Sequence, residues 1–328
     1  MTCRCPKVQQ SYAKSSLILI VIFLGAVSAD FVLAAEGRIA FTSRQGGVST
    51  IYIMDADGRN RTKLTEGGAP DWLPNGTQVG YVHQEDIWVI DSNGTNRANI
   101  TKGRNDFRIR SPDWSPNGNR IAYSGSSDVF RNILVMDARG NDSRFITNDN
   151  QHDATPSWSP HGNKITFRKW GQGPKPEADI FVIDSNGAGL RNLTKNPPAR
   201  NSSPSWSPDG KKIAFVAWPK PFLWTPPHNI FVMNSDGTNP IMITEEGPWV
   251  YEWQPTWSPD SKKIAFVKHT PDGFEDIFTI NADGTGLQNI TQTHRVSEWH
   301  PAWSPAPQAV SPSGRLVTQW GTVKNAED

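Results

Sequence analysis

The sequence predicts an all-β fold, a closed ring of six blades that each contain four antiparallel strands. A Pro-x-Trp element occurs six times along the chain, and a short strand pattern, an apolar strand and a Gly-containing turn follow most copies. The 328 residues include 14 Trp, 27 Gly and 26 Pro but only 5 Met, which is typical of many short strands separated by turns. The Trp residues of successive copies are 42 to 51 residues apart. A repeat of this length fits the blade of a β-propeller better than a helical or leucine-rich repeat.

The segment ahead of the repeats has the pattern of an export signal. Residues 1–16 carry three basic and no acidic side chains, and residues 17–27 form the apolar run LILIVIFLGAV. Val27-Ser28-Ala29 then supplies the small residues of a cleavage site. We therefore expect a signal peptide over residues 1–29, a short linker over 30–36, and a periplasmic or secreted protein. The alternative is an uncleaved anchor over residues 17–35, in which case the chain would be an integral membrane protein.

Charge and cysteine content exclude several classes of site. The chain has 33 basic and 32 acidic residues, so it lacks the basic excess with which proteins hold nucleic acid, and we expect no nucleic-acid partner. Its two cysteines, Cys3 and Cys5, both precede the apolar run. The mature protein would therefore have no disulfide and no thiolate metal site.

The repeat around residues 204–245 shows how one blade is built. Its predicted parts are a first strand at Pro204–Ser207, a type I turn at Ser207–Gly210, a second strand at Lys212–Phe215, a third at Asn229–Asn234, a tight turn at Asp236-Gly237 and a fourth strand at Ile241–Thr244. The third strand has four consecutive apolar residues, as expected for a strand that is buried on both faces. The first strand begins with Pro, where no ladder hydrogen bond is lost.

The two ends of the repeat array are out of phase. The array begins at Gly37–Phe41 without a preceding Trp strand, and it ends with Pro301–Pro305 without the strands that should follow. The last Trp strand can therefore complete the first blade, which closes the ring and removes its free edges. We expect the propeller to span residues 37–305 and a C-terminal tail to span residues 306–328.

The repeats resemble those of the TolB-type β-propeller, which read P-x-W-S-P-D-G-K-x-I-A-F. Pro204–Phe215 matches this pattern throughout, and Pro255–Phe266 departs from it only at Ser261. The resemblance implies a six-bladed propeller. TolB also carries an α/β domain ahead of its propeller, for which the residues between Ala29 and Gly37 leave no room. The Gly-His and Trp-Asp pairs of WD repeats are absent, which disfavours a cytoplasmic WD-type scaffold.

Searches for catalytic motifs return nothing. The chain has no G-x-S-x-G, H-E-x-x-H, P-loop or G-x-G-x-x-G sequence. Its seven His residues do not share one repeat position, so they do not predict a metal cage, and we expect neither a catalytic residue, a metal nor a cofactor. Asp55-Ala56-Asp57-Gly58 resembles the start of a calcium loop, but it stands where every blade needs a turn, and turn chemistry accounts for it.

Binding is expected on the face of the ring where connections vary in length. In a four-stranded blade, the second-to-third and blade-to-blade connections share that face, and they range from the short Val82–Glu85 to the long Val216–His228. The long connections over the fourth to sixth Pro-x-Trp blades are rich in aromatic residues, which mark interaction surfaces. The predicted ligand-binding residues are Trp218, Trp224, Trp249, Tyr251, Glu252, Trp253, Glu298, Trp299 and His300. Alternatively, Trp218 and Trp224 only fold their own loop.

Carboxylates occupy one register, three residues before the repeat Pro. Asp153, Glu252 and Glu298 have this position, and Asn201 takes it in the intervening blade. We expect it to lie at the mouth of the central channel, where the side chains would form a polar or cation-binding rim. The alternative is that they bond to N–H groups of nearby loops.

Together these features predict an exported, monomeric, non-catalytic binding module that recognises a protein, peptide or glycan of the envelope or the extracellular space. One alternative is a polysaccharide lyase or hydrolase with a shallow site in the channel. The other is a structural scaffold in an envelope complex.

Overall fold

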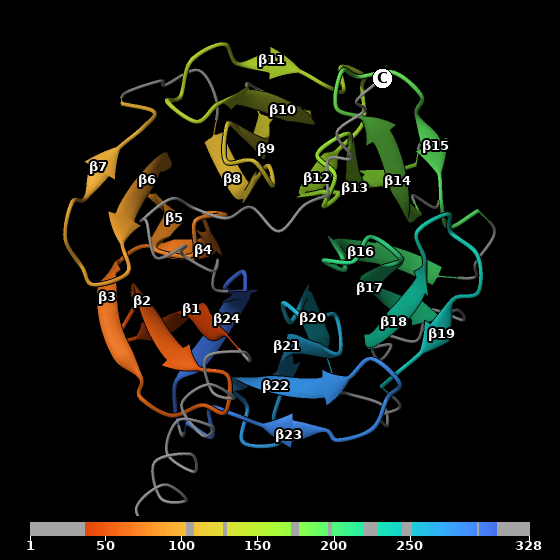
Figure 1. Ribbon diagram of the computed structural model, residues 1–328. Coiled ribbons are helices and arrows are strands. Elements are labelled where there is room, and N and C mark those ends of the chain that lie inside the picture. Colours follow the sequence, from red (N-terminus) through yellow and green to blue (C-terminus); the bar gives the residue numbers. More distant parts are fainter. Residues whose placement is uncertain are drawn as a thin grey trace, which may run out of the picture. The chain divides into compact units, whose positions relative to one another are not determined.

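A computed structural model describes residues 37–102, 108–126, 130–171, 177–195, 199–219, 228–244, 251–293 and 295–306. The described residues form six four-stranded antiparallel sheets, which are arranged as the blades of a ring (Figure 1). Within these ranges no helix is long and apolar enough to cross a membrane. The predicted signal peptide, the linker and the tail beyond Ala306 lie outside the described residues, so their boundaries remain predictions.

Each blade has one strand at the centre of the ring and three further strands outward from it (Figure 1). The innermost strands are β4 (Gly68–Trp72), β8 (Arg108–Trp114), β12 (Asp153–Trp158), β16 (Ala199–Trp206), β20 (Glu252–Trp257) and β24 (Ser297–Trp303). The second strands are β5 (Gln78–His83), β9 (Arg120–Ser126), β13 (Lys164–Trp170), β17 (Lys212–Pro219), β21 (Lys263–His269) and β1 (Arg38–Gln45). The third strands are β6 (Asp86–Asp91), β10 (Arg131–Asp137), β14 (Ala178–Asp184), β18 (Asn229–Asn234), β22 (Glu275–Asn281) and β2 (Val48–Asp55). The outer strands are β7 (Ala98–Asn99), β11 (Arg144–Phe145), β15 (Arg191–Asn192), β19 (Ile241–Met242), β23 (Gln288–Asn289) and β3 (Thr62–Glu66).

We number the blades by their innermost strands. Blade 1 contains β24, β1, β2 and β3, and blades 2 to 6 begin with β4, β8, β12, β16 and β20. The first Pro-x-Trp element thus lies in blade 2 and the sixth in blade 1. The predicted elements of blade 5 are present, including the type I turn in which the amide of Gly210 donates to the carbonyl of Ser207. Its inner strand begins at Ala199 and not at Pro204 as predicted, because the strand continues on the other side of a bulge that precedes this Pro. Its outer strand is shorter than expected, because ladder pairing ends at Met242.

The ring closes as the sequence predicts. β24 pairs antiparallel with β1, placing Trp303 opposite Ile39 and Ala302 opposite Ala40. A second bond crosses from blade 2, since the indole N–H of Trp72 donates to the carbonyl of Ala302 at 3.1 Å. The first blade is therefore assembled from both ends of the repeat array, and neither end leaves a free inner edge.

Apolar side chains pack between neighbouring blades, and the repeat Trp residues take part in this packing. Trp158 of blade 4 lies in one cluster with Ile133 and Val135 of blade 3, and the other interfaces are built in the same way. In blade 2, Gly80 stands where a Cβ atom would come within 1.9 Å of the Trp114 ring. Most blades have Ala at this register, so Gly80 adjusts the space that one particular Trp needs.

A β-bulge interrupts the inner strand of each blade just before the repeat Pro. The register with the second strand shifts at this point in all six blades. The residue that precedes each Pro has a left-handed φ between 49° and 55° and is Ala69, Ser111, Thr155, Ser203, Gln254 or His300. Such bulges redirect a strand and its side chains, and here they bend the six inner strands where they line the channel.

Candidate functional site

The connections between strands divide the ring into two faces. Because the strands of a blade alternate in direction, the second-to-third and blade-to-blade connections lie at one end of the blade, which we call the variable-loop face. The first-to-second and third-to-fourth connections lie at the other end, which we call the tight-turn face. This is the arrangement that the sequence predicts, and binding residues in rigid scaffolds are usually found on such variable connections.

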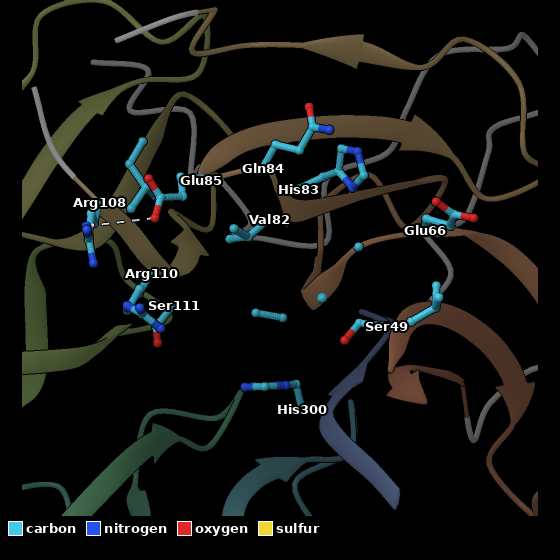
Figure 2. A pocket seen from close by; sticks show the side chains of 15 residues that line it. Ser49, Glu66, Val82, His83, Gln84, Glu85, Arg108, Arg110, Ser111 and His300 are labelled. Atoms are coloured by element: carbon cyan, nitrogen blue, oxygen red, sulfur yellow. Dashed lines mark ion pairs between the residues drawn. The ribbon is translucent and has the colours of Figure 1, made fainter. Parts of the chain in front are cut away.

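A hollow of about 520 Å³ opens on the variable-loop face where blades 1, 2 and 3 meet. Its lining residues are Val48, Ser49, Glu66, Gly67, Gly68, Ala69, Val82, His83, Gln84, Glu85, Arg108, Ile109, Arg110, Ser111 and His300. Figure 2 shows Arg108, Arg110 and Ser111 on one side of the hollow and Glu66 and Ser49 on the opposite side, with His300 below. The hollow thus lies on the predicted face, but mostly over blades other than those predicted to bind.

A second cavity, of about 160 Å³, lies in the central channel and is lined by residues of all six blades. Each blade contributes residues of its Pro-x-Trp element and the residue that precedes it. His300 lines both cavities, and burial lowers its pKa to about 4, so its ring is neutral at pH 7. Its main-chain N–H donates to the side-chain oxygen of Gln254 in blade 6, at 2.8 Å.

Three of the predicted aromatic residues, Trp218, Tyr251 and Trp253, lie together with His228 over blades 5 and 6. The rings of Tyr251 and Trp253 are stacked 5.8 Å apart, with 12° between their planes. His228 stacks on Trp218 with a centroid distance of 4.6 Å and meets the Tyr251 ring edge-on at 5.0 Å. Burial lowers the pKa of His228 to about 4, so its neutral ring joins the two Trp-containing segments.

These four rings are partly exposed, and Trp218 also packs against the apolar cluster between blades 5 and 6. Trp299 is partly exposed in β24, opposite Thr42. Trp224 and Trp249, the other two predicted aromatic residues, lie outside the described residues. His228 was absent from the sequence prediction because nothing in the sequence distinguishes it from the other loop histidines.

The predicted carboxylate rim is not found at the channel mouth. Glu252 and Glu298 both have 0% exposed surface, and so has Asp153. One oxygen of Glu252 accepts hydrogen bonds from the amide of Ile230 and the hydroxyl of Thr244, both in the preceding blade. Glu298 accepts a bond from the guanidinium of Arg61 at 2.5 Å. These side chains therefore join neighbouring strands and blades, as in the alternative interpretation, and present no oxygen to a ligand.

A recurring Thr also links neighbouring strands, and in three blades it ends an Asn-x-Thr triplet: Asn99-Ile100-Thr101, Asn192-Leu193-Thr194 and Asn289-Ile290-Thr291. In five blades the Thr hydroxyl accepts a hydrogen bond from a third-strand Ile amide, as Thr194 does from Ile180 at 3.0 Å. Asn201 then donates to Thr194 at 3.3 Å from the next blade. These Thr hydroxyls thus connect strands within a blade, and Thr194 and Thr244 also connect neighbouring blades.

Two further carboxylates lie in the channel wall, at the middle position of their Pro-x-Trp elements. One oxygen of Asp71 accepts from the amide of Trp114 at 3.0 Å, and one oxygen of Asp113 accepts from the amide of Trp158 at 2.6 Å. Burial raises the pKa of Asp71 to about 7, although the hydrogen bonds from the amides of Trp114 and Trp72 act in the opposite direction. Burial and the neighbouring charge of Asp71 raise the pKa of Asp113 well above its usual range.

The acidic groups in the described ranges do not assemble a metal site. No cluster of three or more His, Cys, Asp or Glu side chains with a geometry suited to a metal ion occurs there. The channel has two adjacent carboxylates on one side and the hydroxyl residues Ser157, Ser205 and Thr256 on the other.

Comparisons with known proteins agree with the observed fold. Residues 77–311 match the family model described as the TolB beta propeller domain. TolB from Acinetobacter baumannii superposes with a TM-score of 0.69 at 22% identity, over 87% of this chain and 71% of that one. TolB from Agrobacterium tumefaciens, described as putative, gives 0.62 at 20% identity, over 77% and 88%.

An enzyme shares the architecture as well. An oligogalacturonate lyase in complex with manganese superposes with a TM-score of 0.57 at 13% identity, over 78% of this chain and 74% of that one. At such identities the superpositions establish a common fold only. A search of curated protein sequences finds no significant match.

Proposed function

We propose that this chain, which belongs to the TolB beta propeller domain family, is an exported binding module that recognises a protein, peptide or glycan through its variable-loop face. The ring serves as a rigid support, and the side chains that differ between blades contact the ligand. We place the contact at Trp218, Tyr251 and Trp253, with Trp224, Trp249, Trp299 and His300 around them. Glu252 and Glu298 are left out because they have no exposed surface.

The observation that carries this proposal is the stacked pair of Tyr251 and Trp253. Two aromatic rings held 5.8 Å apart and nearly parallel form a flat platform, and His228 and Trp218 fix its position from the neighbouring blade. Rigid, partly exposed aromatic side chains contribute most to binding energy in many interfaces, because they bury a large area at a low cost in conformational entropy.

The experiment is a capture from envelope extract on the immobilised mature chain, followed by titration of the ligand identified. Trp253→Ala should weaken binding at least about 30-fold, the equivalent of a hot-spot loss of about 2 kcal/mol. Trp253→Phe keeps a ring and should restore most of the affinity. The matched control is Asp57→Ala, because its turn lies on the tight-turn face and its side chain is only partly buried.

Two results would contradict the proposal. Equal affinities for Trp253→Ala and the parent, with both variants folded by near-UV circular dichroism, would show that the platform does not bind. Turnover of a captured polysaccharide by the parent protein would replace the binding role by the enzymatic alternative, for which the lyase architecture provides the precedent.

A further inference from the structure

Three arginines gather at the interfaces between blades 3, 4 and 5, on the variable-loop face. Arg110 lies in β8 and Arg131 begins β10. The ladder pairs Arg110 with Ser124 of β9 and pairs Ser124 with Ile133, so Arg110 and Arg131, two residues before Ile133, share one side of the sheet. Ile133 packs against blade 4. By this register, Arg110 and Arg131 both lie on the side of the blade 3 sheet that faces blade 4.

Arg168 lies in blade 4, on the side of its sheet that faces blade 5, because the ladder pairs it with Ile180, which packs against blade 5. It lies near the end of β13, and its guanidinium is 3.4 Å from the hydroxyl of Ser202 in blade 5. The Cζ atoms of Arg168 and Arg200 lie 5.5 and 5.6 Å from the centre of the Trp170 ring, so this ring contacts two cations from two blades. Cationic and aromatic side chains thus alternate across the interface.

Within the described ranges these three arginines have no anionic partner, unlike Arg61 and Lys169; Arg110 is exposed, and Arg131 and Arg168 are partly buried. Arg61 pairs with Glu298, and Lys169 pairs with Asp149 and Asp153. No carboxylate among the described residues lies within ion-pair distance of Arg110, Arg131 or Arg168. The Nε atoms of Arg131 and Arg168 are buried and have no hydrogen-bond partner in this part of the chain.

The charges are also close enough to affect one another. Burial lowers the pKa of Arg131, and the charge of Arg110 lowers it further. Burial, and then the charge of Arg131, does the same to the pKa of Arg168. Unpaired like charges that are partly buried, here those of Arg131 and Arg168, destabilise a fold, and departures of this kind are concentrated at functional sites, where a ligand compensates for them.

We propose that Arg110, Arg131 and Arg168 form a binding site for an anionic ligand with at least two oxyanion groups, carboxylate or phosphate. A guanidinium presents a planar fork of N–H donors that fits either group in a bidentate manner. Arg110 also lines the 520 Å³ hollow, so a ligand bound by the row can extend into it. The proposal assigns a ligand class to the face that carries the proposed binding role, but it can be tested without knowing the natural partner.

The experiment is a calorimetric titration of the full mature chain with citrate and with pyrophosphate, at constant ionic strength and against chloride. Arg131→Gln and Arg168→Gln should each weaken binding at least 10-fold. Arg131→Lys keeps the charge but loses the fork, so its affinity should lie between those of the parent and Arg131→Gln. The matched control is Arg139→Gln in the same blade, because Arg139 is exposed in a turn on the tight-turn face and its loss removes the same charge.

Thermal unfolding supplies a readout that separates a binding role from a structural one. Without anion, Arg131→Gln should melt at or above the temperature of the parent, since it removes a repelled and unpaired charge. With saturating anion, only the parent and Arg139→Gln should gain stability. Tighter binding of citrate would assign the site to carboxylates, and tighter binding of pyrophosphate would assign it to phosphates.

The proposal fails if the parent binds neither anion more strongly than chloride, or if Arg131→Gln and Arg168→Gln both bind like the parent. A lower melting temperature for Arg131→Gln without anion, with unchanged titrations, would make the row structural. Such failures leave the aromatic platform untouched, because Trp253→Ala tests that platform with a different ligand.

Discussion

Removal of one side chain, Trp303, tests how firmly the ring is closed. This residue is 8% exposed, and it packs with Ile39 and Phe41 of blade 1 and with Ile277 of blade 6. It stands on the last described strand but contacts the first strand of the array. Trp303→Ala therefore removes apolar contact from the interface that joins the two ends of the chain.

The cost can be estimated from burial. Truncation of a buried Trp to Ala costs about 3–5 kcal/mol through lost transfer energy and the cavity that is left. For a domain of this size, 1 kcal/mol lowers the melting temperature by about 2 °C or somewhat more, so the expected decrease is roughly 6–10 °C. Trp158→Ala provides the reference, because Trp158 is 5% exposed in a blade formed by one continuous segment.

The assay is calorimetric or near-UV circular dichroism melting of both variants and of Leu287→Ala, which changes an exposed side chain. If β24 is as firmly integrated as the other inner strands, Trp303→Ala and Trp158→Ala lower the melting temperature by similar amounts and Leu287→Ala leaves it within about 1 °C. A decrease of less than 2 °C for Trp303→Ala, beside a full decrease for Trp158→Ala, would refute the closure.

Two further predictions concern pH. Asp71 has a pKa of about 7 in the folded state and of about 4 in the unfolded state, so its ionisation destabilises the folded state increasingly as the pH rises between these values. The free energy of unfolding of Asp71→Asn, measured by urea denaturation, should therefore rise relative to that of the parent by up to about 1.4 kcal/mol per pH unit from pH 5 to 7. A difference that stays constant over this range would refute the raised pKa. His228 has a pKa of about 4 in the folded state and near 6.5 in the unfolded state, so its contribution to stability is complete above pH 6.5 and is lost as the pH falls towards 4. His228→Phe keeps a ring against Trp218 and should therefore lose less stability than the parent between pH 6.5 and 4. Melting temperatures measured over this pH range would show the difference.

The ring could be predicted because the same structural residues recur at corresponding positions in all six repeats. Each copy contains a Pro in an inner strand, a Trp between blades and a Gly in a turn, and a single copy such as Pro204–Phe215 already contains all of them. The closure followed from counting, because a Trp strand without followers and a second strand without a predecessor complete one another.

The role of the carboxylates was predicted less well, although their shared register was recognised. Glu252 and Glu298 stand at the same repeat position, but whether that position faces the channel or the neighbouring blade depends on the bulge before Pro255 and Pro301. A Pro-x-Trp sequence does not predict a left-handed φ at the residue before the Pro, because that conformation is unfavourable there for most residues. The bulge redirects the strand, and the carboxyl groups become links between blades.

The arginine row and the hollow could not be predicted, for a different reason. Arg110, Arg131 and Arg168 occupy an inner, a third and a second strand, so no common repeat position connects them. They come together only because blades 3 and 4 are neighbours and because each residue lies near the same end of its strand. Periodicity identifies what all blades share, and a site made of differences between blades has no periodic signal.

The residues before the repeat Pro show how the channel can change without changing the fold. All six have a left-handed backbone, from Ala69 to His300, so the constraint falls on φ and not on the side chain. Ala, Ser, Thr, Gln and His all satisfy it, and they differ in size and in hydrogen bonding. His300 is the one among them that can titrate, it faces both cavities, and its Nδ1 atom is buried without a hydrogen-bond partner in the described part of the chain. Because folding requires only the left-handed bend at this position, the imidazole of His300 is available for contacts in the channel mouth that the propeller does not need for its own stability.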